Sequence, residues 1–353
     1  MPFQPQRTYD VNWAFSNKKQ ADYSTPVASN DLNQRIAVIG SDVAELSRTS
    51  HSDDKQFGKG HEFPTLFREL TREMKFARTM DLSSLTAGWA AAFGMGKVIT
   101  SQPNPGSNPT AYRHVITFLD ASAGKDAPVT TIYEQVNAQA AFERKLESLA
   151  VSDFSISGSA RDVAQLQMSL IGSGKTTNGA VTVPALTPVS VFDMGGLTFK
   201  LGTPGAPATL SERLLDFSVR VTQNLDVQNS YRPGGGLYAS RMWVGARRAT
   251  FDAQIYIDSA NTDLMDYFMN GDLLEVSFKF TGDTILAGQP EAHDCEIKFP
   301  AARITAIPIA TQSDMLTYRI SAGETDVYRD AGGTPNEPLQ ITVTNTIPSY
   351  LGT

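Results

Sequence analysis

The sequence is poor in cysteine and in histidine. Cys295 is the only cysteine among 353 residues, so an internal disulfide cannot form and a zinc site built from cysteines is excluded. The four histidines are scattered, and no spacing pairs them as metal ligands. We therefore expect no metal or other cofactor, and a reducing compartment during assembly.

Long apolar runs and an excess of positive charge are also absent. No stretch of about 18 apolar residues occurs, and the first ten residues lack the apolar core of a signal peptide, so we expect neither a membrane span nor export by that route. The net charge is -7, which disfavours tight binding of nucleic-acid phosphates.

The residues that are present favour β-structure. Glycine, proline and small polar residues are frequent, and apolar and polar residues alternate in 166–170, 274–280, 295–299 and 339–343. Such alternation is typical of half-buried antiparallel strands. The fold is therefore predicted to be mainly β, with short flanking helices.

Two helices are predicted. Asp81 is placed as the N-terminal cap of a helix that ends at Gly94, and Thr262 as the cap of a short helix that ends at Gly271. Residues 63–77 show helical spacing of apolar residues, but their structure stays ambiguous.

A fragment of a nucleotide-binding motif occurs at 169–179, which reads SLIGSGKTTNG. A working P-loop needs a first glycine where Ser169 stands, and a helix after Thr176, where glycine and proline follow instead. We interpret the segment as a strand end and a polar turn.

Other enzymatic signatures are incomplete. His61-Glu62 lacks the second histidine of a zinc protease, and no nucleophile elbow occurs. Alternation places Cys295 on an apolar face, where a thiol is unreactive. The cluster Arg241, Arg247 and Arg248 is too short for a nucleic-acid patch and fits strand ends or an intersubunit ion pair. We expect no enzyme.

Composition and the pattern of apolar residues divide the chain into four parts. Residues 1–34 are an N-terminal arm, 35–175 a first β-unit, 176–190 a linker and 191–353 a second β-unit. The two units are suggested by a faint repeat, in which 152–159 (SDFSISGS) resembles 215–222 (LDFSVRVT).

Aromatic residues mark candidate contact regions. The arm packs either on its own domain or on a neighbouring subunit, and the glycine- and proline-rich loops 100–113 and 224–240 are either mobile surface or partner-binding loops. The candidate inter-ring or intersubunit contacts are Trp13, Tyr23, Tyr112, Tyr231, Arg232 and Tyr238.

This arrangement resembles the major tail tube proteins of long, non-contractile-tailed bacteriophages. The resemblance rests on the polar arm, on 85–98 (LTAGWAAAFGMGKV), on the strand pair within 146–175, and on the pattern of 219–228 and 245–258. It covers most of the chain.

The resemblance implies a structural virion protein with β-sandwich or β-barrel units. Such subunits join their sheets into trimeric, pseudo-hexameric or hexameric rings, which stack into the tail tube. The tube conducts DNA in transit without binding it specifically, and it contacts a tape-measure protein and neck and tip proteins. Assembly would take place in the host cytoplasm. The alternatives are another tail component, such as a tip, terminator or sheath-like protein, or an enzyme on a β-scaffold.

Overall fold

The computed structural model describes residues 11–39, 44–52, 67–119, 124, 126–136, 143–178, 184–227, 230–231, 236–258, 264–312, 315–322 and 337–352. In this part the chain is mainly β, as predicted, and 19 strands belong to one hydrogen-bonded network. The helices are α1 (Ser84–Met95) and α2 (Leu264–Asn270). The strands are β1 (Val11–Phe15), β2 (Gln34–Ala37), β3 (Glu45–Ser52), β4 (Phe67–Asp81), β5 (Gly96–Ser101), β6 (Tyr112–Phe118), β7 (Thr130–Val136), β8 (Glu143–Ser159), β9 (Gln165–Gly172), β10 (Thr176–Asn178), β11 (Leu197–Gly202), β12 (Ala208–Thr209), β13 (Leu214–Thr222), β14 (Leu225–Asp226), β15 (Trp243–Val244), β16 (Arg248–Tyr256), β17 (Leu273–Thr284), β18 (Ala292–Ala306), β19 (Ile309–Gln312), β20 (Met315–Ala322) and β21 (Gln340–Asn345).

The alternating segments form strands with one face in the core. In β9, the side chains of Leu166, Met168 and Leu170 are buried, whereas those of Gln165 and Gln167 are exposed. The same alternation recurs in β17, β18 and β21, whose apolar residues join one large core cluster. A burial period of two is what a pleated strand imposes, so the sequence pattern predicted these elements correctly.

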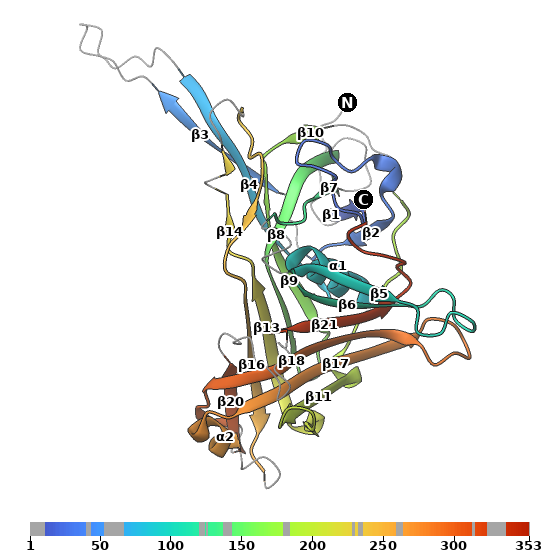
Figure 1. Ribbon diagram of the computed structural model, residues 1–353, viewed down its shortest axis with the longest axis vertical. Helices are drawn as coiled ribbons and strands as arrows, with labels where there is room; N and C mark the ends of the chain where they lie inside the picture. Colours follow the sequence, from blue (N-terminus) through green and yellow to red (C-terminus); the bar gives the residue numbers. More distant parts are fainter. Residues whose placement is uncertain are drawn as a thin grey trace, which may run out of the picture.

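Helix α1 fills the space between the sheet strands. All twelve of its residues are buried, and it packs against β8 on one side and β6 and β21 on the other (Figure 1). Glycine permits this closeness, because a Cβ on Gly94 would lie 2.6 Å from the Phe154 ring. Burial on every face explains why the helix shows no polar stripe in its sequence.

The predicted caps of α1 were wrong. Ser83 is the N-terminal cap, and with Thr86 it forms a capping box. Asp81 instead ends β4, where it pairs with Gln165. At the other end Gly96, with φ of 89°, is the C-terminal cap, because left-handed backbone geometry costs glycine little.

The ambiguous segment 63–77 is a strand from Phe67 onward; residues 63–66 lie outside the described part. β4 pairs with β3 on one side and β9 on the other. Cross-strand pairing on both edges outweighs the helical spacing of its apolar residues. The short helix α2 occurs as predicted and is followed by Gly271 (φ 69°), while the predicted cap Thr262 is outside the described residues.

The order of strand pairing occurs twice along the chain. The antiparallel series β2–β1–β7–β8–β9–β4–β3 is followed by β12–β11–β17–β18–β20–β16–β13. A helix follows β4 in the first series and β16 in the second. In addition, β10 pairs with β8, and β21 pairs with β18.

The two segments that look alike in sequence are neighbours rather than counterparts. Strand β8 contains 152–159 and pairs with β13, which contains 215–222, so that Asp153 lies opposite Thr222 and Ser159 opposite Asp216. Both are half-buried strands in one sheet, and that shared environment explains their similar alternation. The part of the N-terminal arm that is described contributes β1, which lies between β2 and β7.

Two features project from the body of the molecule. The β3–β4 hairpin extends far from the rest of the chain (upper left in Figure 1). The connections after β5 and β17 project together from a different side, where Asn108 Nδ2 donates to Glu291 Oε2 at 3.2 Å (right in Figure 1). The loop between β5 and β6 therefore projects from a different side of the molecule than the β3–β4 hairpin (Figure 1).

Candidate assembly surfaces

Strands β3 and β19 are two of the strands that have an open edge among the described residues. Within the described residues, β3 pairs only with β4, and β19 pairs only with β20. Both edges carry apolar side chains: Leu46 is 47% exposed, and Ile309 and Leu316 are 54% and 55% exposed. An exposed apolar edge strand invites pairing with another strand, so these edges are candidate contact surfaces.

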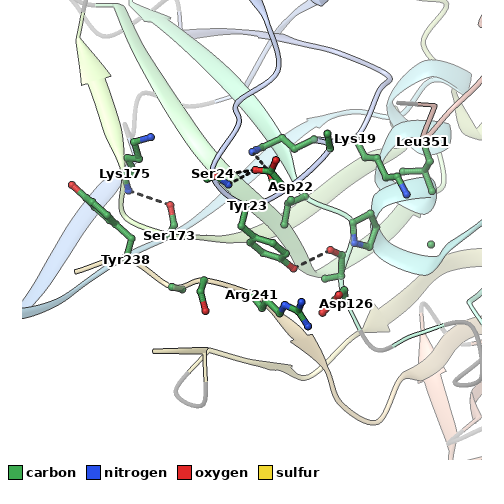
Figure 2. A pocket seen from close by; sticks show the side chains of 18 of the residues that line it. Lys19, Asp22, Tyr23, Ser24, Asp126, Ser173, Lys175, Tyr238, Arg241 and Leu351 are labelled. Carbon is green, nitrogen blue, oxygen red and sulfur yellow. Dashed lines mark hydrogen bonds between the residues drawn. The ribbon is translucent and has the colours of Figure 1, made fainter. Parts of the chain in front are cut away.

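A pocket of about 730 Å³ brings two of the predicted contact residues together. Tyr23 from the N-terminal segment and Tyr238 from the β13–β16 connection both line it (Figure 2). Its charged wall residues are Lys19, Asp22, Asp126, Lys175 and Arg241.

Hydrogen bonds hold the pocket wall in place. Tyr23 Oη reaches the carbonyl oxygens of Ala127 and Met242 at 3.2 and 3.3 Å, and burial raises the pKa of Tyr23 to about 12. Asp22 accepts hydrogen bonds from the hydroxyl and amide of Ser24 and the amide of Thr25, which lower its pKa to about 2. These bonds thus hold the side chains of Tyr23 and Asp22 in place.

The connection between β13 and β16 lies against β4. The Arg72 amide donates to the Leu237 carbonyl at 2.9 Å, the Arg72 guanidinium lies over the Tyr238 ring at 5.9 Å, and the Tyr231 hydroxyl donates to the Arg72 carbonyl. Arg72 therefore anchors a loop from the second half of the chain onto the first.

The other predicted contact residues have different surroundings. Trp13 is 1% exposed and packs edge to face on Phe76, with 5.7 Å between the ring centroids. Tyr112 is half-buried at the start of β6 and lies opposite Asn345. Arg232 lies outside the described residues.

A family comparison identifies the architecture. The model of the family described as phage tail tube protein matches residues 77–322, which is more than half of the chain. The chain belongs to this family. Among curated proteins, none matches the chain.

In this tail tube protein, the P-loop-like trio is Gly174-Lys175-Thr176; Gly174 and Lys175 lie in the turn between β9 and β10, and Thr176 begins β10. Lys175 Nζ lies 2.7 Å from Oε2 of Glu147, which is buried, and Lys145 Nζ lies 2.9 Å from Oε1. Gly174 has a φ of 77°, and a Cβ there would lie 2.8 Å from the Arg72 backbone. The glycine thus serves the close approach of two chain segments, and the lysine pairs with a carboxylate.

Cys295 and His114, the side chains with the greatest potential for chemistry, are buried. Cys295 is fully buried, and burial raises the pKa of its thiol, which keeps it protonated. His114 is also buried, with its Nε2 2.8 Å from the Ile347 carbonyl. In the described part of the chain, no group of three or more potential ligands could hold a metal ion. Nor does that part contain a helix of sufficient length and apolarity to cross a membrane.

Two arginines of the basic cluster, Arg241 and Arg247, contact different groups. The Arg241 guanidinium lies over the Trp243 ring at 5.7 Å, and Arg247 donates to the Leu119 carbonyl. The predicted intersubunit role of these residues stays a prediction.

Sequence reasoning missed a buried charge cluster. Glu134 on β7 is fully buried, with Oε2 2.6 Å from Arg144 Nη2 and Oε1 3.4 Å from Arg78 Nη2. Arg144 Nη2 also donates to the Ala44 carbonyl at 2.9 Å. The cluster thereby ties the residue just before β3 to β7 and β8. Three charges so far apart in sequence give no local signal.

Proposed function

We propose that this tail tube protein assembles with copies of itself, through its sheet edges, into rings that stack to form the tube that conducts phage DNA. The observation that carries the proposal is the pair of open edges. Ile309 and Leu316 expose apolar surface on β19 and β20, and β3 pairs on one side only among the described residues. Closing such edges in a ring removes the risk of uncontrolled aggregation.

The repeated pairing order supports two β-units per chain, at 35–175 and 191–353, joined by the linker 176–190. A ring of three chains would then present six similar units, and we favour this pseudo-hexameric trimer over a hexamer. We also propose the long, non-contractile tail type, from the resemblance of 85–98 and of the strand pair within 146–175 to such tail proteins.

The polar face of the β8–β9–β13 sheet supports a role as the wall of a channel. Its side chains include Ser155, Ser157 and Gln167, and Asp153 lies near Arg220 with an N–O distance of 3.7 Å. Because the charges of Arg220 and Asp153 offset each other on this face, DNA phosphates would gain little by binding there, and the polymer could slide.

The pocket around Tyr23 and Tyr238 and the loop at Tyr231 are proposed contacts to a neighbouring subunit or ring. Tyr112 lies on the other projecting face and suits a contact of the same kind. Inside the tube the partner would be a tape-measure protein, and at its ends neck and tip proteins. The assembled protein would reside in the virion tail after assembly in the host cytoplasm, with no catalytic role.

Negative-stain electron microscopy of the concentrated, purified protein tests the proposal. Long hollow tubes are expected. Isolated rings or caps would instead support another tail component, such as a terminator or tip protein. Monomers at all concentrations would contradict self-assembly by this chain alone.

A further inference from the structure

One junction between the halves of the chain is already made within the subunit. Strands β8 and β13 pair from Asp153 opposite Thr222 to Ser159 opposite Asp216. The pairing buries Ile156, which is 1% exposed, and Val221, which is fully buried. This junction is the only place where sheet strands of the first pairing series hydrogen-bond to those of the second among the described residues of the two series.

The end of β18 together with β19 occupies the position in the second series that β8 occupies in the first. In β8–β9 the register shifts between Val151 and Asp153, and in β18–β20 it shifts between Ile304 and Ala306. At each shift a hydroxyl donates to the partner strand: Ser152 Oγ to the Ser169 carbonyl at 3.2 Å, and Thr305 Oγ1 to the Ser321 carbonyl at 3.0 Å. The two irregularities therefore correspond residue by residue.

Strand β3 corresponds in the same way to β13. Phe76 pairs with Leu170 and Phe251 with Ala322, and these partners lie beside the two register shifts. Glu73 lies three residues before Phe76 in β4, and it pairs with Ser47 of β3. In the same way, Arg248 lies three residues before Phe251 in β16, and it pairs with Thr222 of β13. Ser47 is thus the counterpart of Thr222, and Leu46 of Val221.

The counterparts differ in exposure at the edges where the described residues provide no further strand. Ile309 follows Ala306 by three residues, as Ile156 follows Asp153 (306 to 309 and 153 to 156). Ile156 is 1% exposed and Ile309 54%; Val221 is fully buried and Leu46 47% exposed. The residues are buried at the β8–β13 junction and exposed at the edges of β3 and β19. This pattern is expected when these two edges pair with another copy of the chain.

The backbone at the open edge is also directed outward. The Pro308 carbonyl accepts a hydrogen bond from the Arg319 amide at 3.0 Å, so the proline faces β20. Because N–H and C=O groups alternate between the two sides of a strand, those of Ile307 and Ile309 face the open side. The missing N–H of Pro308 therefore removes no donor from a new ladder.

We propose that the end of β18 and β19 of one subunit pair antiparallel with β3 of the next copy, with Ile307 opposite Leu46 and Ala306 opposite Ser47. This register repeats Phe154 opposite Val221 and Asp153 opposite Thr222. The contact is head-to-tail, which gives a ring when the rotation from one copy to the next closes. The inference rests on the proposed self-assembly and specifies the residues that carry it.

Cysteine crosslinking tests the register. The Gln223 amide donates to the Ser152 carbonyl at 2.8 Å, so the next pair, Thr222 and Asp153, is a non-hydrogen-bonded pair. Its Cα atoms are about 4.5 Å apart in a typical sheet, within reach of a disulfide. The equivalent Ser47→Cys/Ala306→Cys variant should, on oxidation of assembled tubes, form covalent multiples of the chain that end at the ring size. Buried Cys295 does not compete.

Matched variants separate the outcomes. Asp153→Cys/Thr222→Cys should form an intrachain disulfide at any concentration, which reports that the oxidation works. Glu45→Cys/Ala306→Cys is displaced by two residues and should crosslink at least tenfold less.

If the Ser47/Ala306 change prevents assembly, Glu45→Cys/Pro308→Cys tests the same register. Tubes that assemble without crosslinking in either in-register variant, or that crosslink more in the displaced one, would overturn this register while leaving self-assembly intact. Failure of the unmodified protein to assemble would instead overturn the proposed function and this inference with it.

Discussion

Lys175 and Glu147 form an ion pair across the β8–β10 pairing, with Nζ 2.7 Å from Oε2. The Glu147 side chain is 3% exposed, whereas that of Lys175 is 41% exposed. The lysine of the P-loop-like trio therefore neutralises a buried carboxylate.

Lys175→Met should lower the free energy of unfolding by about 1–2 kcal/mol, because Glu147 would keep only Lys145 as a charged partner. Urea denaturation measures the change, and Lys175→Arg is the conservative control. Addition of ATP should leave the melting temperature of the unmodified protein unchanged. A rise that depends on Lys175 would revive nucleotide binding.

Acid should weaken the subunit partly through Glu147. Burial alone would raise the pKa of Glu147, but hydrogen bonds and charge from Lys175 and Lys145 outweigh it and lower that pKa below its ordinary 4.5. A depressed carboxyl pKa adds stability above pH 4.5 that is lost as the pH falls through the folded-state value. Glu147→Gln should therefore flatten the decline in stability below pH 4.5. An unchanged pH profile would contradict this role.

Removal of the buried charge at β7 should cost much more. Glu134→Gln leaves Arg78 and Arg144 buried with no carboxylate between them, and we expect a loss of about 3–5 kcal/mol. Glu73→Gln is the control, because its partner Lys75 is 61% exposed and a surface pair contributes about 0–1 kcal/mol. Thermal unfolding of both variants gives the comparison. Equal effects would contradict a structural role for the cluster.

A charge on the open edge should block assembly without unfolding the chain. Ile309 is 54% exposed, so Ile309→Lys should change stability by less than about 0.5 kcal/mol while preventing tubes. Met269→Lys, on α2 at 74% exposure, should leave tubes normal. Electron microscopy and sedimentation report assembly. Normal tubes from Ile309→Lys would exclude β19 from the contact.

The loop that follows β13 should matter for tube length. Deletion of 225–236 should leave a folded subunit that forms short tubes or none. Because the Tyr231 hydroxyl donates to the Arg72 carbonyl, the milder Tyr231→Phe change should shorten tubes with little effect on folding. Normal lengths from the deletion would remove this loop from the mechanism.

Local pattern predicted local structure well. Alternation identified β9, β17, β18 and β21 because a strand with one buried face must repeat every two residues. It left residues 67–77 ambiguous, because helical spacing of apolar residues there competes with pairing to β3 and β9, and the residues of β9 lie far away in the sequence. The N-terminal cap of α1 was predicted at Asp81, two residues before the actual cap, Ser83. Both residue types cap helices well, but Asp81 is the last residue of β4.

The candidate contacts were less predictable. Tyr23 and Tyr238 belong to one pocket although more than two hundred residues separate them, and no local pattern reports such a meeting. Trp13 was predicted as a contact residue because it is an aromatic residue in a polar arm. It is instead buried within the subunit, because β1 pairs with β7. Similar alternation in β8 and β13 suggested a repeat, yet the segments pair with each other.

The β8–β13 pairing has a consequence for the rate of assembly. Within one chain it forms in a unimolecular step, independent of protein concentration. Only the joints between β19 and β3 of different copies would need a collision. In the proposed ring, half of the joints would form during folding, and nucleation would require fewer encounters than for a ring of the same circumference made from single units.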